Sequence, residues 1–126
     1  MQILIIDDEE RVLDSLKRLI LLKYKNAKIT EARCGKEAVD SIKNQTFDIV
    51  ISDRYMGGLD GDAVLRYARK IQPKAKRIMY SGYTDDESIR SAIESGDIEY
   101  LLEKGCSKQS ILDVLEEIFL LKESSS

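Results

Sequence analysis

The 126-residue sequence has no histidine and no tryptophan, one proline and only two cysteines. Without histidine, the chain has no Ser-His-Asp catalytic triad, no histidine zinc site and no phosphohistidine of its own. Its cysteines, Cys34 and Cys106, are too few for a disulfide scaffold and suit a reducing cytoplasm. Apolar runs stay well below the roughly 18–20 residues that span a bilayer. These absences leave a small intracellular domain as the expectation.

Composition also favours one globular, cytoplasmic domain. Apolar residues make up 43% and charged residues 34% of the chain, which excludes a disordered tail and a membrane protein. Lysine and arginine number 20 against 23 acids, so the net charge of −3 gives no reason to expect direct nucleic-acid binding. The start of the chain, Ile3–Ile6 and then four acids, does not resemble a signal peptide. We expect one domain over residues 1–122 and a flexible tail or the start of a linker over residues 123–126.

Short apolar runs alternate with amphipathic stretches along the chain. The runs are Ile3–Ile6, Ile49–Ile51, Ile78–Tyr80 and Tyr100–Leu102, and their uninterrupted apolar character is typical of strands covered on both faces. A weaker run with alternating charge, Lys28–Ala32, is typical of an edge strand.

Between these runs, apolar residues recur at helical spacing. The stripes comprise Val12, Leu13, Leu16, Leu19 and Ile20; Ala38, Val39 and Ile42; Val64, Leu65, Ala68 and Ile71; Ile89, Ala92 and Ile93; and Ile111, Leu115, Ile118 and Phe119. Thr84, followed three residues later by Glu87, predicts a capping box for the fourth helix. The pattern is strand–helix repeated five times, which predicts an α/β fold with a parallel sheet between two helical layers.

Polar residues follow the predicted strands at the sheet edge where open parallel folds bind ligands. They are Asp7 and Asp8, Asp53, Ser81 and Lys104. The acids after the first strand are also explained by a helix dipole, which favours each by about 0.3–1 kcal/mol. Asp53, however, ends an apolar strand, and two carboxylates about 4 Å apart repel by about 4 kcal/mol at a dielectric near 20. A hard cation with oxygen ligands offsets that repulsion, and Mg²⁺ fits this description.

At these positions the chain resembles the receiver domain of two-component response regulators. The stretch Asp53–Gly61, with the sequence DRYMGGLDG, is similar to the family's Asp-x-x-Met-Pro loop leading into Asp-Gly. The resemblance covers about residues 2–121. It implies the flavodoxin-like (βα)5 fold with strand order 2-1-3-4-5.

The resemblance also implies a regulatory phosphoacceptor, not a conventional enzyme. Asp53 would take a phosphoryl group from a phosphohistidine on a sensor histidine kinase or phosphotransfer protein. Mg²⁺ would be held by Asp8 and Asp53, by Asp7 mainly through water, and by the backbone carbonyl of Tyr55.

Two further residues are implied to act on the phosphoryl group itself. Lys104 would pair with its oxygens, and the Ser81 hydroxyl would donate a hydrogen bond to one of them. Ser81 would move toward the group and re-bias the face made by the last helices, for a downstream protein or an output domain absent from this chain.

Three positions depart from the family pattern. Gly57 and Gly105 stand where the family has prolines, so a trans Lys104–Gly105 bond and a shifted lysine are expected. Leu101 occupies the place of the family's switching aromatic residue. Tyr100 is one residue earlier and therefore faces the other side of its strand.

Three other functions compete with this one. A degenerate receiver would bind a partner without being phosphorylated, and the two glycines keep that alternative open. An aspartate-dependent phosphohydrolase would have an acid two residues after the nucleophile, where this chain has Tyr55. A flavin carrier would have a Ser-, Thr- and Gly-rich phosphate loop after the first strand, where Asp7 and its acidic neighbours would repel phosphate.

Overall fold

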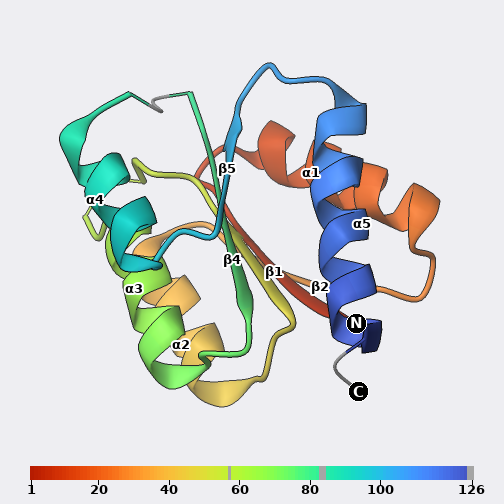
Figure 1. Cartoon of the computed structure of the whole chain (residues 1–126), viewed down its shortest axis with the longest axis horizontal. Coiled ribbons are helices and arrows are strands. Elements are labelled where there is room, and N and C mark those ends of the chain that lie inside the picture. Colours follow the sequence, from red (N-terminus) through yellow and green to blue (C-terminus); the bar gives the residue numbers. More distant parts are fainter. Residues whose placement is uncertain (57, 83–84, 125–126) are drawn as a thin grey trace.

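A computed structural model describes residues 1–56, 58–82 and 85–124. It contains a five-stranded parallel sheet in the order β2-β1-β3-β4-β5, as predicted (Figure 1). The strands are β1 (Gln2–Ile6), β2 (Lys28–Ala32), β3 (Ile49–Ser52), β4 (Lys76–Ser81) and β5 (Tyr100–Glu103). The weakly apolar β2 is an edge strand, where its charged side chains remain accessible to water.

Five helices cover the sheet in two layers. They are α1 (Glu10–Lys23), α2 (Gly35–Asn44), α3 (Gly61–Ile71), α4 (Glu87–Ser95) and α5 (Lys108–Ser124). Helices α2, α3 and α4 lie on one side of the sheet, and α1 and α5 lie on the other (Figure 1). The predicted flavodoxin-like arrangement is therefore confirmed.

Each face of the sheet has its own hydrophobic core because neighbouring strand residues point to opposite sides. In β1, Leu4 packs in the core under α2, α3 and α4, whereas Ile5 packs in the core under α1 and α5. The same alternation separates the two residues considered for the aromatic switch position. Leu101 packs against the first core and Tyr100 against the second, so Tyr100 does not replace an aromatic side chain at position 101.

One local prediction is wrong. The cap of α4 is Asp86, whose Oδ1 accepts from the Ile89 backbone N–H, and Glu87 is the first helical residue and not the third. Thr84 lies outside the described residues. Ile71 and Ile93 lie in the predicted helices and continue the apolar stripes in sequence, but they are 46% and 43% exposed.

The C-terminal helix is longer than the sequence indicates. α5 continues to Ser124, so residues 123 and 124 are helical and do not begin a tail. Residues 125 and 126 lie outside the described part of the chain, and the domain limit at residue 122 stays a prediction. Within the described residues, no helix is both long enough and apolar enough to cross a membrane.

Candidate functional site

The carboxyl edge of the sheet places the predicted site residues by main-chain hydrogen bonds. The Asp7 amide donates to the Ala32 carbonyl at 3.1 Å, and the Asp53 amide donates to the Ile6 carbonyl at 2.9 Å. The Lys104 amide donates to the Ser81 backbone carbonyl at 2.9 Å. Each charged residue therefore extends the ladder of its neighbouring strand by one step before the chain leaves the sheet.

Lys104 joins two buried carboxylates. Its Nζ lies 2.9 Å from Asp7 Oδ2 and 3.3 Å from Asp53 Oδ2. Asp7 is 1% exposed and Asp53 8% exposed, so a lysine is needed to offset their charges. The glycine that follows the lysine, Gly105, has φ +98° and no cis peptide bond occurs in the described residues. The expected trans bond is confirmed, and Lys104 still reaches both aspartates.

The third carboxylate, Asp8, lies at the open side of this cluster. Ligand oxygens of Asp7, Asp8 and Asp53 lie within 4.8 Å of one another, and Asp8 is exposed. Two buried oxygen donors and one accessible donor form the kind of partly hydrated site that Mg²⁺ uses. The sequence-predicted acids are thus brought together in a donor set that fits this cation.

The electrostatics of the cluster raise the pKa of Asp53 above its ordinary value. Burial raises the pKa of Asp53, and the nearby charge of Asp7 raises it further, against the lowering effect of Lys104. Burial lowers the pKa of Lys104, but its hydrogen bond to Asp7 and the charges of both aspartates outweigh burial and raise it. Lys104 is therefore a permanent cation, while the Asp53 carboxylate lacks full compensation.

The backbone around Asp53 fixes the direction of its side chain. Asp53 Oδ1 accepts from the Arg54 amide at 2.8 Å, which leaves Oδ2 toward Lys104. Gly61, the first residue of α3, donates its N–H to the Arg54 carbonyl at 2.7 Å. A Cβ at Gly61 would lie 1.8 Å from the Asp53 carbonyl oxygen, so only glycine permits this approach.

The two other predicted residues come from the end of β4 and from the connection that follows Asp53. Ser81 ends β4 and is fully buried, with its main chain paired to β5 beside Lys104. Tyr55 follows on the β3–α3 connection, and its side chain is 45% exposed. The departing residue Gly57 lies outside the described residues.

Sequence reasoning missed Arg54, which directly follows Asp53. Its side chain is only 8% exposed, and it forms an ion pair with Asp86 and a hydrogen bond with Ser88 on α4. The guanidinium also lies over the Tyr55 ring, 4.7 Å from its centroid. An arginine after an apolar strand is usually solvated, and nothing in its spacing to α4 indicates a buried partner.

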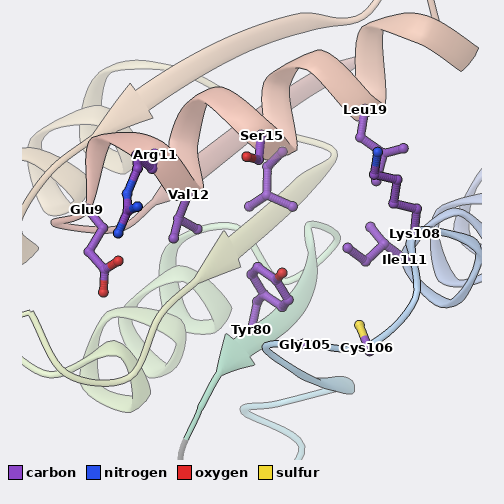
Figure 2. A pocket seen from close by; sticks show the side chains of 11 residues that line it. Glu9, Arg11, Val12, Ser15, Leu19, Tyr80, Gly105, Cys106, Lys108 and Ile111 are labelled. Carbon is purple, nitrogen blue, oxygen red and sulfur yellow. The ribbon is translucent and has the colours of Figure 1, made fainter.

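A pocket of about 470 Å³ lies beside the acidic edge, between α1 and the β5–α5 connection (Figure 2). Tyr80 projects into it from the sheet, and Gly105 and Cys106 bound it on the other side (Figure 2). Its apolar lining is rimmed by charged residues: Glu9, Arg11 and Lys108. Since Gly105 follows Lys104, this pocket and the carboxylate cluster are neighbouring parts of one surface.

Comparison with known proteins decides the family. The model of the response regulator receiver domain matches residues 3–116. The chain belongs to the response regulator receiver family. A receiver domain also explains the fold: a CheY-like receiver from Methanospirillum hungatei superposes with a TM-score of 0.88 at 24% identity, covering 99% of this chain and 98% of that one.

Two further proteins are similar to this chain. The receiver of an HD domain-containing protein from Pseudomonas fluorescens is 28% identical with a TM-score of 0.87, covering 98% of this chain and 97% of that one. The uncharacterized transcriptional regulatory protein YesN of Bacillus subtilis is 35% identical over 118 residues, 93% of this chain. This receiver spans only 32% of YesN's length.

Proposed function

We propose that this receiver domain, residues 1–122, is a phosphoacceptor that works in the cytoplasm and that Asp53 carries the phosphoryl group. An Asp53 carboxylate oxygen attacks the phosphorus of a phosphohistidine on a sensor kinase or phosphotransfer protein. The new O–P bond replaces the N–P bond, and the electron pair of that bond leaves with the imidazole. The observation that carries the proposal is Lys104 Nζ within 3.3 Å of Asp53 and 2.9 Å of Asp7 at the open edge of the sheet.

The cluster supplies what phosphoryl transfer requires of a protein, which is positioning and compensation of charge. Asp7, Asp8, Asp53 and the Tyr55 carbonyl would hold Mg²⁺, which supplies positive charge against the phosphoryl oxygens. Lys104, with its raised pKa, stays protonated and is free to exchange a carboxylate for a phosphoryl oxygen. The buried Ser81 would hydrogen-bond the phosphoryl group and transmit its presence to the α4-β5-α5 face.

The pocket between α1 and the β5–α5 connection belongs to the same proposal as a contact surface for the protein donor. It pairs an apolar lining with charges of both signs, the composition of a specific protein interface. Glu9 on its rim lies two residues after Asp7, so a donor seated there meets the carboxylate edge directly. Downstream, the receiver would act on a partner protein or on an output domain elsewhere in a longer chain, without contacting nucleic acid or membrane itself.

Intact-mass measurement after incubation with Mg²⁺ and acetyl phosphate tests the phosphoacceptor role. We expect one phosphoryl adduct on the wild-type chain, no adduct on Asp53→Asn, and a strong loss of adduct without Mg²⁺. Exposed Asp40→Asn is the matched control and should react like the wild type. An unmodified wild type, beside a control receiver that reacts, would favour the degenerate receiver that binds its partner without phosphorylation.

A further inference from the structure

Arg54 links the residue next to the acceptor with the first turn of α4. Its backbone holds the predicted phosphoacceptor Asp53, because its N–H donates to Asp53 Oδ1 and its carbonyl accepts from the Gly61 N–H. Its side chain contacts the start of α4, because the guanidinium forms an ion pair with Asp86 and a hydrogen bond with Ser88. Arg54 therefore contacts both the proposed phosphoacceptor, Asp53, and a helix of the proposed output face, α4.

The Asp86 carboxylate divides its two oxygens between these tasks. Oδ1 accepts from the Ile89 N–H at 3.1 Å and caps the helix, while Oδ2 pairs with Arg54. The hydrogen bond from Ile89 lowers the pKa of Asp86, and Arg54 lowers it further, so the carboxylate is charged at neutral pH. The cap and the ion pair are separable, because asparagine also caps helices but carries no charge.

The arginine is firmly held but not fully satisfied. Its side chain is 8% exposed, and Nε is buried without a hydrogen-bond partner among the described residues. A rearrangement that gives water access to Nε offsets part of the loss of the ion pair. The Arg54–Asp86 pair therefore leaves one buried donor of the guanidinium, Nε, without a hydrogen bond among the described residues.

We propose that Arg54 is a positioning residue whose pair with Asp86 holds α4 in the arrangement that goes with a free Asp53 carboxylate. The inference rests on the proposed function. In this arrangement Asp53 Oδ2 contacts Lys104 and Oδ1 contacts the Arg54 N–H. A phosphoryl group on Asp53 would replace the Lys104 contact, and the shift of Ser81 and α4 that belongs to the proposed function would then have to separate Asp86 from Arg54.

The pair opposes that movement because the Arg54 backbone is fixed on both sides. Binding of a phosphoryl analogue must therefore work against the pair, and removing the pair makes binding tighter. The opposite sign follows from a merely structural role: loosening the loop would leave affinity unchanged or reduce it. Affinity and stability thus move in opposite directions only if the pair restrains activation.

Calorimetric titration with beryllofluoride, a tetrahedral phosphoryl analogue, at saturating Mg²⁺ tests this inference. We expect Asp86→Asn to bind about three- to tenfold more tightly than the wild type. Thermal unfolding of the same variant should show a lower midpoint. Asp85→Asn is the matched control: its carboxylate pairs with the exposed Arg90, and its affinity should stay within about 1.5-fold.

A second variant excludes a simple defect in the cap. Arg54→Met should tighten beryllofluoride binding to a similar extent, and Asp86→Asn should add less than about twofold in that background. Unchanged or weaker binding by Asp86→Asn, or additive effects in the double variant, would overturn the restraint while leaving the phosphoacceptor role intact. Failure of both the wild type and Asp85→Asn to bind would instead overturn the phosphoacceptor proposal, and this inference with it.

Discussion

We expect the charge of Asp53 to lower the stability of the fold, and replacement by asparagine measures by how much. Ligand oxygens of Asp53, Asp7 and Asp8 lie within 4.8 Å of one another, and Asp53 Oδ2 is 3.3 Å from Lys104 Nζ. At an effective dielectric near 20, the two repulsions amount to about 7 kcal/mol and the attraction to about 5 kcal/mol. Water weakens the share of exposed Asp8, while burial of Asp53 adds to the penalty. We therefore expect Asp53→Asn to stabilise the chain by about 1–2 kcal/mol.

The direction agrees with the raised pKa of Asp53. A carboxyl whose pKa is higher in the folded state than in the unfolded chain lowers stability as pH rises through the interval between the two values. Asparagine keeps the shape of the side chain and removes the charge. The variant should thus unfold about 3–6 °C higher than the wild type at pH 7 in a chelator.

Thermal unfolding followed by circular dichroism, with chelator and with Mg²⁺, is the assay. Mg²⁺ should raise the midpoint of the wild type more than that of Asp53→Asn, because only the wild type offers the third charged ligand. Exposed Asp40→Asn should shift neither midpoint by more than about 1 °C. A less stable Asp53→Asn in chelator would refute the reasoning, since it would mean that Lys104 overcompensates the two neighbouring acids.

Two further predictions concern the backbone after Lys104 and the α4–β5 connection. Gly105→Ala should cost about 1–2 kcal/mol in chemical unfolding, because φ is +98° and no neighbouring atom blocks a Cβ; Gly82→Ala, also in open space, should cost less than half as much. Asp97→Asn should destabilise the chain by about 1–2 kcal/mol at pH 7. Burial raises the pKa of Asp97, but hydrogen bonds from Arg69 and Arg66 outweigh it and the net shift is downward, so this stabilisation is lost as pH falls below about 4. Urea unfolding at pH 7 and pH 3.5 should show the difference between wild type and Asp97→Asn shrinking; a constant difference would contradict the role of its charge.

The strands and the carboxylate cluster could be predicted because their signals are local. A parallel strand buried on both faces needs a short run such as Ile49–Ile51, and the polar residue that ends it must lie at the sheet's carboxyl edge. The sequence therefore places Asp53 and Lys104 at this edge without any knowledge of side-chain contacts. The orientation of Asp53 toward Lys104 depends on the Arg54 amide and could not be deduced from residue types.

The burial of two arginines and the start of α4 could not be predicted from the sequence. Arg77 is 4% exposed because the backbone carbonyls of Ala75, Gly96 and Asp97 accept hydrogen bonds from its guanidinium. Every residue has a backbone carbonyl, so the sequence does not indicate which arginine will be buried by such bonds. Arg54 is buried by a helix 32 residues away. The choice of Asp86 over Thr84 as the cap likewise depends on where the chain enters α4 and not on which residue types are available.

The main-chain bonds that position Asp7, Asp53 and Lys104 have a consequence for how such a domain diversifies. Each of these residues is anchored through its amide, and a peptide group has the same amide whatever side chain it carries, proline excepted. A substitution other than proline at any of the three therefore changes the charge at this edge while the main-chain hydrogen bond can still form. Side chains at this edge can therefore change from one related sequence to another while the backbone that carries them stays the same.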